Sequence, residues 1–467
     1  MQALSSFIPL HFYHTNDLHS NLEQWPAAVS YLNKRRHFHE TKKESAFFLD
    51  IGDHADRVHP ITEATRGKGN VKLLNQAGIH HATIGNNEGI TLSKEELDTL
   101  YDDADFKVLL ANLFNENGKR PSWAEPFDII ETKEGIKVGL IGLTIPFYPF
   151  YKELGWDIRD PLELLPELLE MIRPQSDIIV LLSHLGYPQD EELARNFDID
   201  VIIGAHTHHL LKTSVLLNDT LIAQCGKNSY YVGQMKLLVD RQTREVVKKE
   251  GAAVDVSNEE PHPQTQALLH QLKDEAEEVL NSPIVDVPYP ISVSWTKPSL
   301  FPDLLAEGVR EWCDADIAML NSGLLLESLE PGSVTLKDLH RLCPHPINPC
   351  LLEVKGAVLK ETIAYAFTEK MIHLPLKGLG FRGEILGRMA FSGMEIVVEE
   401  TKAEAYVKDI IIDGKPLESD KIYKLGTADM FTFGPLYPGL SQSSSKKYFM
   451  PEMMRDVLAD KLKRYFQ

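Results

Sequence analysis

Short apolar runs recur along the first half of the chain, and each stops at a small polar cluster. The first run includes Phe12 and Tyr13 and breaks at Asn16, Asp17 and His19. Apolar runs of this length predict buried strands, whereas apolar positions three and four apart predict helices. The predicted strands end at Thr15 or cover residues 46–51, 79–84, 108–110, 136–144, 178–182 and 199–203. The predicted helices cover residues 21–37, 71–77 and 161–172. Alternating strands and helices over roughly 240 residues are typical of an α/β domain with a largely buried sheet.

The second half of the chain has a different pattern. Residues 240–258 are polar and charged, residues 264–281 carry apolar side chains at helical spacing, and five prolines lie between 283 and 302. The predicted elements after these prolines are helices at 300–313 and 358–367, strands at 394–398 and 407–412, and a hairpin turn at Asp413 and Gly414. We therefore expect an N-terminal domain over residues 1–258, a linker helix over 259–282 and a C-terminal domain over 283–467.

The polar clusters at the predicted strand ends are rich in side chains that bind metals. An Asp and a His two residues apart are a weak signal by themselves, because a turn Asp beside a surface His gives the same pattern. Such residues recur at five strand ends, however, and these ends meet at one edge of an α/β sheet. Two neighbouring divalent ions need a bridging carboxylate, several imidazoles and one or two further oxygens. The candidate ligands are Asp17, His19, Asp53, Asn86, His184, His206 and His208. A two-metal site explains this set better than five unrelated polar loops.

Composition narrows the class of protein and of partner. A chain of 467 residues exceeds what one hydrophobic core usually organises, and 43% hydrophobic with 25% charged residues is typical of a soluble globular protein. The formal charge of −20 disfavours a broad surface for nucleic acid or an anionic membrane. Residues Met1 to Leu10 lack a signal-peptide pattern, so we expect a cytoplasmic protein. The four cysteines are too scattered for a disulfide framework, and we expect buried thiols. The sequence does not indicate an oligomeric state.

Short motifs at the strand ends resemble those of the calcineurin-like metallophosphoesterases. They are Asp17-x-His19, Gly52-Asp53, Gly85-Asn86, Ser183-His184 and Gly204-x-His206-x-His208. Motifs in the second half resemble the C-terminal domain of the 5'-nucleotidase family, and they are Asn321-Ser322-Gly323, Pro331-Gly332-x-Val334-Thr335-x-x-Asp338-Leu339 and Val354-x-Gly356-x-x-Leu359. The resemblance covers nearly the whole chain, and a bacterial YunD-type branch matches it well. It implies an N-terminal metallophosphoesterase domain, a sheet sandwich flanked by helices, and a C-terminal α+β substrate-binding domain.

The resemblance also implies a role for each candidate ligand. One ion would bind Asp17, His19, Asp53 and His208, and the other would bind Asp53, Asn86, His184 and His206. The two divalent ions would be Mn, Zn, Co or Fe. A metal-bound hydroxide would attack phosphorus in line with the leaving nucleoside oxygen, without a covalent enzyme intermediate. The implied substrate is a small-molecule nucleotide.

The sequence departs from this family at the expected general acid. Most relatives have a His after the Asn of the third motif, but this chain has Asn87, which cannot act as an acid at neutral pH. The acidic partner that is usual three residues later is also absent, since Ile90 stands there. A general acid contributes about 10² to 10⁴-fold, so its loss slows hydrolysis without abolishing it. Asn87 is thus a catalytic candidate, and we hypothesise that His54 or His81 replaces the acid, although a structural role suits either histidine equally well.

A second departure concerns the substrate phosphate and base. Relatives carry an Arg two residues after the Asn-x-Gly turn, where this chain has Leu325. Without this Arg, the substrate phosphate would bind to the metals or to another cationic side chain. The candidates for substrate binding are Asn321, Arg341 and Arg382, with Phe381, Phe431 and Phe433 for the base. The family clamps the base between two aromatic rings, and such stacking contributes on the order of 1 to 3 kcal/mol per base. Core packing is the alternative role for each phenylalanine.

Two classes of function are consistent with these residues. The first is metal-dependent hydrolysis of a nucleotide, with a nucleoside 5'-monophosphate as the simplest substrate and a 2',3'-cyclic nucleotide or a nucleotide sugar as variants. The second is a nucleotide-binding or sensing protein that keeps the metals but has reduced or lost turnover because Asn87 replaces the usual His. The intact ligand set favours the enzyme, because a protein freed from chemistry does not need all of these side chains.

Overall fold

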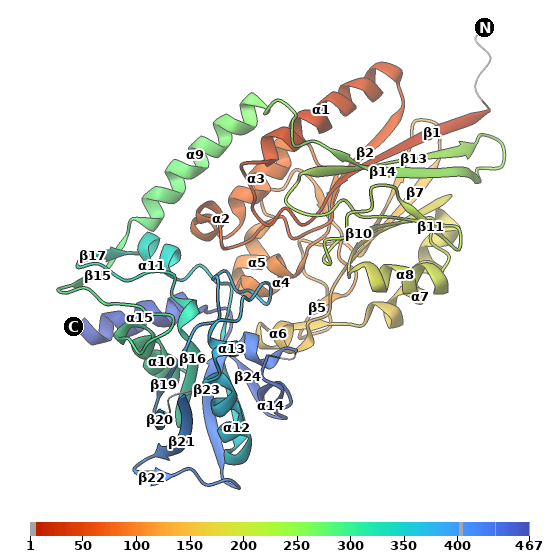
Figure 1. The fold of residues 1–467 in the computed structure, drawn as a ribbon. Coiled ribbons are helices and arrows are strands. Elements are labelled where there is room, and N and C mark those ends of the chain that lie inside the picture. The colour runs from red at the N-terminus through yellow and green to blue at the C-terminus, as the bar shows by residue number, and fades with distance from the viewer. Residues whose placement is uncertain (1–5, 401–404, 435, 467) are drawn as a thin grey trace. The chain divides into compact units, whose positions relative to one another are not determined.

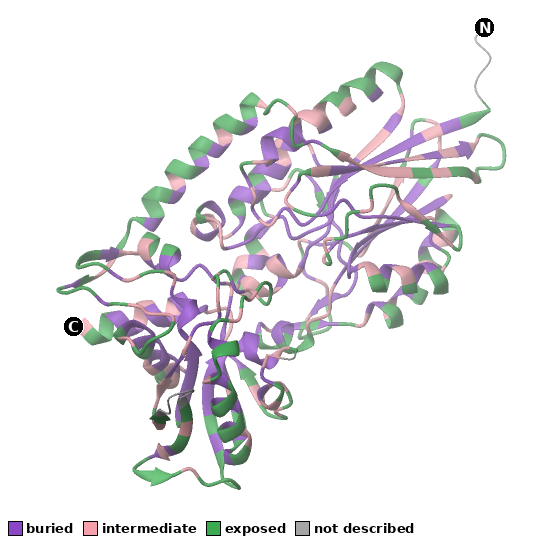
Figure 2. Cartoon of the chain, viewed as in Figure 1, coloured by how far each residue is buried: buried purple, intermediate pink, exposed green. Residues whose placement is uncertain are grey.

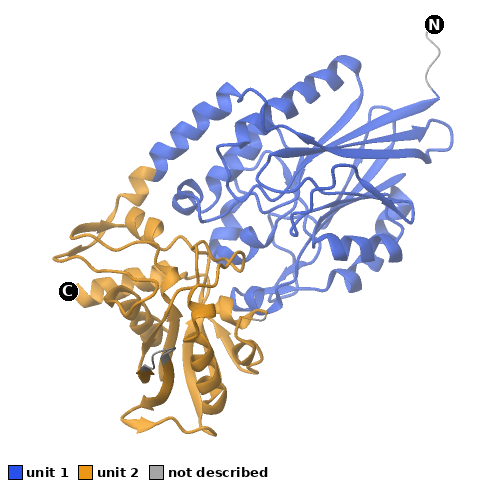
Figure 3. Cartoon of the chain, viewed as in Figure 1, with its two compact units in different colours: residues 1–276 blue, residues 277–467 orange. Residues whose placement is uncertain are grey.

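The computed structural model describes residues 6–400, 405–434 and 436–466, and the chain forms two compact units, residues 1–276 and 277–467 (Figure 3). The division falls within helix α9 (Pro263–Leu280), in the segment where the sequence predicts a linker helix. Residues 1–5, part of the segment that lacks a signal-peptide pattern, lie outside the described residues. No helix in the described ranges is long and apolar enough to cross a membrane.

Unit 1 is built on two six-stranded sheets that share one hydrophobic core (Figure 1). The first sheet has, in order, β14 (Val246–Asp255), β13 (Tyr231–Asp240), β1 (Phe7–Thr15), β2 (Ser45–Asp50), β3 (His81–Ala82) and β4 (Lys107–Val108). The second has β11 (Val215–Leu217), β12 (Thr220–Ala223), β10 (Val201–Gly204), β9 (Ile178–His184), β7 (Lys137–Thr144) and β6 (Phe127–Glu131). Leu10, Phe12 and Leu49 from the first sheet meet Val180 and Ile203 from the second in the core.

Helices cover the outer faces of these sheets. The helices of unit 1 before α9 are α1 (Trp25–Lys42), α2 (Pro60–Thr65), α3 (Lys68–Ala77), α4 (Asn86–Thr91), α5 (Lys94–Leu100), α6 (Tyr148–Glu153), α7 (Pro161–Ile172) and α8 (Tyr187–Asn196). Leu165 of α7 and Leu193 of α8 pack with Ile179 and Ile202 of the second sheet. Helix α1 lies along the first sheet (Figure 1). The strands are largely buried and the helices are exposed on one side (Figure 2), which confirms the sheet sandwich that the resemblance implies.

Some elements differ from those that the sequence predicts. Helix α7 has the predicted bounds, whereas only His81–Ala82 (β3) of the predicted strand 79–84, and only Val108 (the second residue of β4) of the predicted strand 108–110, are in strands. The polar segment 240–258, in which we predicted no strand, contains the whole of β14. This strand lies at the edge of the first sheet, where β13 is the one named strand beside it and an isolated bridge joins Ala252 to Thr213. An edge strand keeps much of its surface in water, so it shows no apolar run.

Parallel strands bring the predicted ligands together. Strands β1, β2 and β3 are parallel neighbours in the first sheet, and β7, β9 and β10 are parallel neighbours in the second. Their carboxyl ends therefore lie at one edge of each sheet, where ligands bind in such folds. Because the sheets stack face to face, the loops after β1, β2 and β3 meet those after β9 and β10.

Unit 2 is an α+β unit with a mixed five-stranded sheet. Its strands are, in order, β19 (Met389–Ser392), β16 (Ile317–Asn321), β23 (Ile422–Ala428), β18 (Pro349–Lys355) and β24 (Lys446–Tyr448). The smaller sheets contain β15 (Pro283–Val287) with β17 (Gly332–Thr335), and β20 (Glu395–Glu400) with β21 (Ala405–Ile412) and β22 (Lys415–Pro416). The helices are α10 (Leu300–Trp312), α11 (Leu336–Leu342), α12 (Gly356–Ala366), α13 (Glu369–Ile372), α14 (Pro438–Ser441) and α15 (Met454–Phe466). The chain's four cysteines are buried free thiols, as predicted.

Candidate metal centre

The backbone at the predicted ligands adopts an unusual conformation. Asp17, His19 and Asp53 have φ angles of 50°, 48° and 50°, and His206 and His208 have φ angles of 70° and 57°. The left-handed region costs a residue other than glycine on the order of 1 kcal/mol or more, so it persists only where the surrounding structure enforces it. Backbone bonds enforce it here, since Asp17 N–H donates to the Gly52 carbonyl at 3.0 Å and His19 N–H to the Asp53 carbonyl at 2.8 Å. Concentrated strain of this kind is typical of a functional site.

Two glycines allow the loops after β2 and β3 to touch. A Cβ atom on Gly85 would lie 2.0 Å from Asp53 Oδ1, and one on Gly52 would lie 2.2 Å from the Gly85 nitrogen. The buried Glu88 carboxylate then ties the loops together by accepting hydrogen bonds from the backbone N–H groups of Asp53, Ala55 and Gly85 at 3.0, 2.8 and 2.9 Å. Sequence reasoning missed Glu88, although an acidic side chain at the third position of α4 is a known capping signal.

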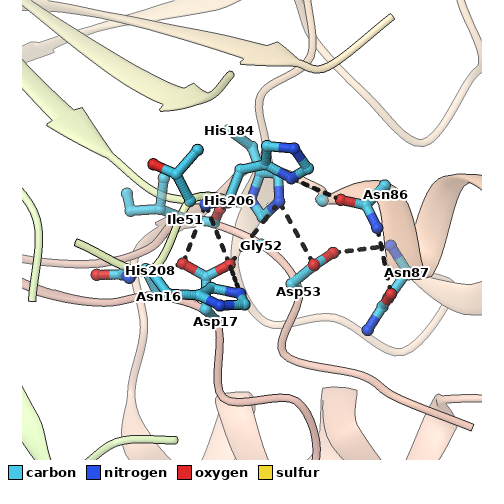
Figure 4. A network of polar contacts seen from close by, with 12 residues as sticks. Asn16, Asp17, Ile51, Gly52, Asp53, Asn86, Asn87, His184, His206 and His208 are labelled. Atoms are coloured by element: carbon cyan, nitrogen blue, oxygen red, sulfur yellow. Dashed lines mark hydrogen bonds and ion pairs between the residues drawn. The ribbon is translucent and has the colours of Figure 1, made fainter. Parts of the chain in front are cut away.

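Carboxylates and imidazoles converge at these loops (Figure 4). Asp17 Oδ1 lies 3.8 Å from His19 Nε2, 3.9 Å from His184 Nε2 and 3.6 Å from His208 Nε2. Asp53 Oδ2 lies 3.7 Å from His19 Nε2 and 3.5 Å from His184 Nε2. Two groups of donors each lie within 4.8 Å of one another, Asp17 with His19 and His208, and Asp17 with Asp53 and His184. These donors are of the types that bind Zn and Mn, and their spacing fits divalent ions.

The remaining predicted ligands border the same cluster. His206 Nδ1 lies 2.9 Å from Asn86 Oδ1, and the His206 backbone N–H donates to both carboxylate oxygens of Asp17 at 3.1 and 3.0 Å (Figure 4). Asn86 begins α4, directly after the Gly85 contact. The structure therefore brings all seven predicted ligands to one place.

His184 shows how the protein prepares a ligand. Its Nδ1–H donates to the Ile51 carbonyl at 2.6 Å, which leaves Nε2 as the free ligand atom, and this buried Nε2 has no hydrogen-bond partner. Burial opposes a charge on His184, but Asp53 and Asp17 outweigh it and raise its pKa to about 10. Burial also raises the pKa of Asp17, whereas His184 holds the pKa of Asp53 well below its usual range despite burial. Two buried carboxylates are therefore costly without a positive charge nearby, and bound divalent ions would supply that charge.

Asn87 and Asp56 contact His19 from outside the cluster of ligand atoms. The Asn87 backbone N–H donates to Asp53 Oδ1 at 2.7 Å, and its Nδ2 lies 3.0 Å from His19 Nδ1 and 3.1 Å from the Ala55 carbonyl oxygen. Asp56 Oδ2 lies 3.6 Å from the same His19 Nδ1. A carboxylate behind a ligating histidine orients the ring and raises its basicity. Sequence reasoning missed Asp56, whose signal was a second carboxylate three residues after Asp53.

The two candidate replacements for the general acid have partners outside the ligand set. His54 is buried with its ring edge against Trp25, at a centroid distance of 4.7 Å, and its Nδ1 lies 3.2 Å from Asn70 Nδ2. Burial lowers the pKa of His54 to about 3, so the ring is neutral at pH 7. His81 Nε2 lies 2.9 Å from the Asp128 carboxylate. These surroundings favour a structural role for both histidines.

The aromatic candidates in unit 2 lie in or beside its core. Phe381 is 3% exposed and stacks on His345, with centroids 5.2 Å apart and an interplanar angle of 4°. Phe431 is fully buried with its ring edge-on to Tyr437. Phe433 stacks on Tyr448 at a centroid distance of 6.5 Å. Their positions match the core-packing alternative better than an exposed base clamp.

The polar candidates in unit 2 also have protein partners. Arg341 pairs with Glu327 and Asp338, Arg382 donates its backbone N–H to His345 Nδ1 at 2.9 Å, and Asn321 Nδ2 donates to the Leu386 carbonyl at 2.9 Å. Asn321 Oδ1 is buried without a hydrogen-bond partner. Their roles in substrate binding stay predictions.

Comparisons with known proteins agree with this architecture. Residues 10–210 match the family model described as calcineurin-like phosphoesterase, and residues 284–434 match the model described as 5'-nucleotidase, C-terminal domain. The chain is 45% identical over 459 residues to YunD of Bacillus subtilis (strain 168), an uncharacterized metallophosphoesterase, covering 97% of this chain and 99% of YunD. It is 26% identical over 485 residues to a 5'-nucleotidase of Vibrio vulnificus (strain CMCP6), covering 88% of this chain and 82% of that protein.

Solved structures show the same fold. A 5'-nucleotidase precursor from Thermus thermophilus matches with a TM-score of 0.61 and 19% identity, over 98% of this chain and 97% of the other. The NAD nucleotidase of Haemophilus influenzae matches with a TM-score of 0.70 and 16% identity, over 99% and 97% of the two chains. At such identities the likeness concerns the fold alone.

Proposed function

The chain belongs to the calcineurin-like metallophosphoesterases that carry a 5'-nucleotidase C-terminal domain, and on this premise we propose that its substrates are nucleotides. It is accordingly a metal-dependent hydrolase of phosphoric esters. A nucleoside 5'-monophosphate is the simplest substrate in this proposal, because the matched C-terminal domain is that of 5'-nucleotidases. A 2',3'-cyclic nucleotide and a nucleotide sugar are the variants.

One observation carries the proposed chemistry: two buried carboxylates, Asp17 and Asp53, meet three imidazole Nε2 atoms at 3.5 to 3.9 Å. Calcineurin-like metallophosphoesterases use a binuclear divalent metal centre, and these residues with Asn86 and His206 would hold it. When bound, two such ions lower the pKa of the attacking water and stabilise charge on the phosphoryl group.

The protein's own groups hold this site in place. The Ile51 carbonyl fixes the tautomer of His184, and the Glu88 carboxylate fixes the loop that carries Asp53. Asn87 contacts His19 and Asp53, but its amide has no proton to give to a leaving group at neutral pH. We therefore propose slow turnover of substrates with poor leaving groups.

A substrate panel tests the proposal. Purified full-length chain would be incubated with AMP, UMP, a 2',3'-cyclic nucleotide and a UDP-sugar, each with Mn²⁺ and with EDTA. Release of phosphate would be measured for the two monophosphates, and release of nucleoside monophosphate would be measured by chromatography for the cyclic nucleotide and the UDP-sugar. We expect Mn²⁺-dependent release from at least one, and its loss in Asp17→Asn. Asp102→Asn, which changes an exposed carboxylate in the same unit, is the matched control and should keep full activity.

The panel also separates the enzyme from the binding or sensing protein. Metal-dependent binding of these nucleotides without release of any product would support the sensor and would contradict hydrolysis as the proposed function. Release that persists at the same rate in Asp17→Asn would contradict the assigned metal ligands.

A further inference from the structure

A second group of metal-binding side chains lies in unit 1 outside the seven predicted ligands. The ligand atoms of His11, His39 and Glu44 all lie within 4.8 Å of one another. Glu44 Oε2 lies 3.2 Å from His11 Nε2 and 2.9 Å from His39 Nδ1. The imidazole rings of His11 and His39 are 4.0 Å apart between centroids, with an interplanar angle of 31°. Two imidazoles and a carboxylate form a ligand set that zinc uses in proteins, with positions left for water or another ligand.

The fold separates this cluster from the catalytic centre. His11 lies within β1, whereas Asp17 follows the end of the strand. Side chains alternate along a strand, so His11 and Tyr13 face away from the core that Leu10 and Phe12 enter. Asp17 also lies six residues after His11. An extended chain rises about 3.3 Å per residue, so the two residues can lie as far as roughly 20 Å apart.

The end of helix α1 sets the geometry of the other two ligands. His39 lies in the last turn of α1, and the next residues leave the helix through Lys43, which has a φ of 56°. The Glu44 backbone N–H then donates to the His39 carbonyl at 3.0 Å, a bond typical of a Schellman-type helix end. This turn folds the Glu44 side chain back onto His39, and strand pairing of β1 with β2 brings His11 alongside.

His11 presents an unused ligand atom to the cluster. The residue is 8% exposed, and its buried Nε2 has no hydrogen-bond partner although Glu44 Oε2 lies 3.2 Å away. A buried imidazole nitrogen without a partner is costly unless another atom occupies the position in front of it. Burial, then the neighbouring His39, lower the pKa of His11 to about 4, so at pH 7 the ring is neutral and can bind a metal.

Outer contacts support His39 as a ligand. His39 Nε2 lies 2.8 Å from the Tyr13 hydroxyl, which in turn accepts a hydrogen bond from Arg35 Nε at 2.9 Å. Metal-binding histidines usually donate their second ring N–H to such a partner. In the tautomer that binds a metal at Nδ1, the single ring proton of neutral His39 sits on Nε2 and donates to the Tyr13 hydroxyl.

The cluster borders an open pocket of about 700 Å³ on the surface of unit 1. Its lining includes His11, Tyr13, Arg35, Glu44 and Lys236. A bound ion would therefore be reached from solvent, and water would complete its coordination.

We propose that His11 Nε2, His39 Nδ1 and the Glu44 carboxylate bind one Zn²⁺ ion at the surface of unit 1, separately from the two-metal centre. The ion joins the end of α1 to β1 and stabilises unit 1 by mass action. Two nitrogen donors favour Zn²⁺ over Mg²⁺ or Ca²⁺, which prefer oxygen ligands.

Zinc counting on the full-length chain tests the proposal. The chain would be stripped with a chelator and dialysed against buffered free Zn²⁺, and bound zinc would be measured by mass spectrometry of the metal. Asp17→Asn serves as the background, because it changes one predicted ligand of the two-metal centre and none of the three residues proposed here. Adding His11→Gln or Glu44→Gln should remove one further zinc per chain and reduce the zinc-dependent rise in Tm. His37→Gln and Glu40→Gln change exposed residues on α1 and should bind zinc like the background.

The same variants, made in the chain that keeps Asp17, test whether the proposed zinc site is separate from the two-metal centre. His11→Gln and Glu44→Gln should keep Mn²⁺-dependent phosphoester hydrolysis within about twofold of the unmodified chain, because they leave the catalytic ligands intact. Glu44 has a partly exposed side chain, so Glu44→Gln should fold even if His11→Gln does not. Equal zinc content in Glu44→Gln and Glu40→Gln would overturn the proposal, whether or not the chain hydrolyses nucleotides.

Discussion

Asp17 and Asp53 are buried almost completely, and they face imidazoles, backbone N–H groups and the Asn16 side-chain amide, whose Nδ2 donates to Asp17 Oδ2 at 2.8 Å. A buried carboxylate is costly unless it is paired or coordinates a metal. Without ions, a protonated His184 supplies the missing positive charge, because the two carboxylates raise its pKa to about 10. Metal binding would displace this proton, so the chain's affinity for its ions should depend on pH.

We propose that Asn87 affects how the rate of hydrolysis depends on the leaving group. We expect Asn87→His to raise kcat for a nucleoside 5'-monophosphate about tenfold, because an imidazole can protonate a poor leaving group. Ile90 offers the new ring no acidic partner, so the gain should stay at the low end of the usual range. p-Nitrophenyl phosphate, whose leaving group needs little protonation, should change by less than twofold.

Asn87→Gln is the matched control, since it keeps an amide and adds only a methylene. Steady-state rates for both substrates would be compared at saturating Mn²⁺. An equal gain on both substrates would contradict leaving-group protonation and would point to altered metal binding through the Asn87 contact with His19.

The convergence of the seven candidate ligands could be predicted from the sequence because each lies just after an apolar run. Asp17 and His206 come from strands far apart in the chain, yet their residue types and strand-end positions sufficed. Asp56 and Glu88 could not be found this way, because their role arises from contacts with His19 and with three backbone N–H groups. Phe381, in a plausible aromatic motif, stacks on His345, and its role in binding the base stays a prediction.

At the scale of elements, the site depends on how closely the loops after β2 and β3 approach. Gly52 and Gly85 form this contact, and Glu88 of α4 then accepts N–H groups from both loops. Strand β3 has only two residues, so these loop contacts, more than the strand, place Asn86. The sequence predicted a longer strand there because apolar residues continue past the end of the ladder.

Gly85→Ala should therefore disable the centre. The added Cβ would lie 2.0 Å from Asp53 Oδ1 and 2.6 Å from the Asp53 nitrogen, so the loop must shift. A misplacement of about 1 Å at such a site costs about 10²-fold in rate, and we expect a loss of that size together with weaker Mn²⁺ binding. Activity and bound Mn²⁺ would be measured in parallel.

Gly426→Ala on β23 of unit 2 provides the comparison, because the added Cβ would lie 3.3 Å from its nearest neighbour, the Val309 carbonyl oxygen of α10. It should keep the activity of the unmodified chain. Normal activity in Gly85→Ala would show that the two loops need not touch for the metals to bind.

At the scale of the whole molecule, the chain is two compact units with separate buried titratable groups. The sequence indicated two domains through its prolines and its change of pattern, but its apolar runs did not show which strands of the first half belong to which of the two sheets, and only the family resemblance implied a sheet sandwich. Apolar runs predict that a strand is buried without specifying its neighbours, and β1 and β9 look alike in this respect. Which polar side chains are buried could not be predicted from the sequence either, because their burial depends on the packing of the folded chain.

Unit 2 contains two such groups whose effects on stability oppose each other. His345 Nε2–H donates to the Leu324 carbonyl at 3.0 Å and Nδ1 accepts from the Arg382 N–H at 2.9 Å, so a second ring proton has no acceptor. Burial lowers the pKa of His345 to about 3. Burial raises the pKa of Asp429 to about 7.

The pH dependence of unfolding should reveal both groups. Between about pH 6.5 and 3 the unfolded chain binds a proton that native His345 excludes, so this group's contribution to stability is lost as pH falls. Between about pH 4 and 7 native Asp429 keeps a proton that the unfolded chain releases, so stability is lost as pH rises. From pH 7 to pH 5 each effect amounts to about 2 kcal/mol, with opposite signs. We expect the destabilisation by His345→Gln to shrink by that amount over this range, and Asp429→Asn to become correspondingly less favourable relative to the unmodified chain.

Urea unfolding at pH 7, 6 and 5 would measure these differences, with hydrogen exchange followed by mass spectrometry to assign the transition to unit 2. EDTA in every sample removes any contribution of metal binding in unit 1. The two variants serve as controls for each other, because any general effect of pH on the unfolded chain moves both in the same direction. A destabilisation by His345→Gln that is constant across the three pH values would mean that the folded unit accepts a proton at His345, against its hydrogen bonding to Leu324 and Arg382.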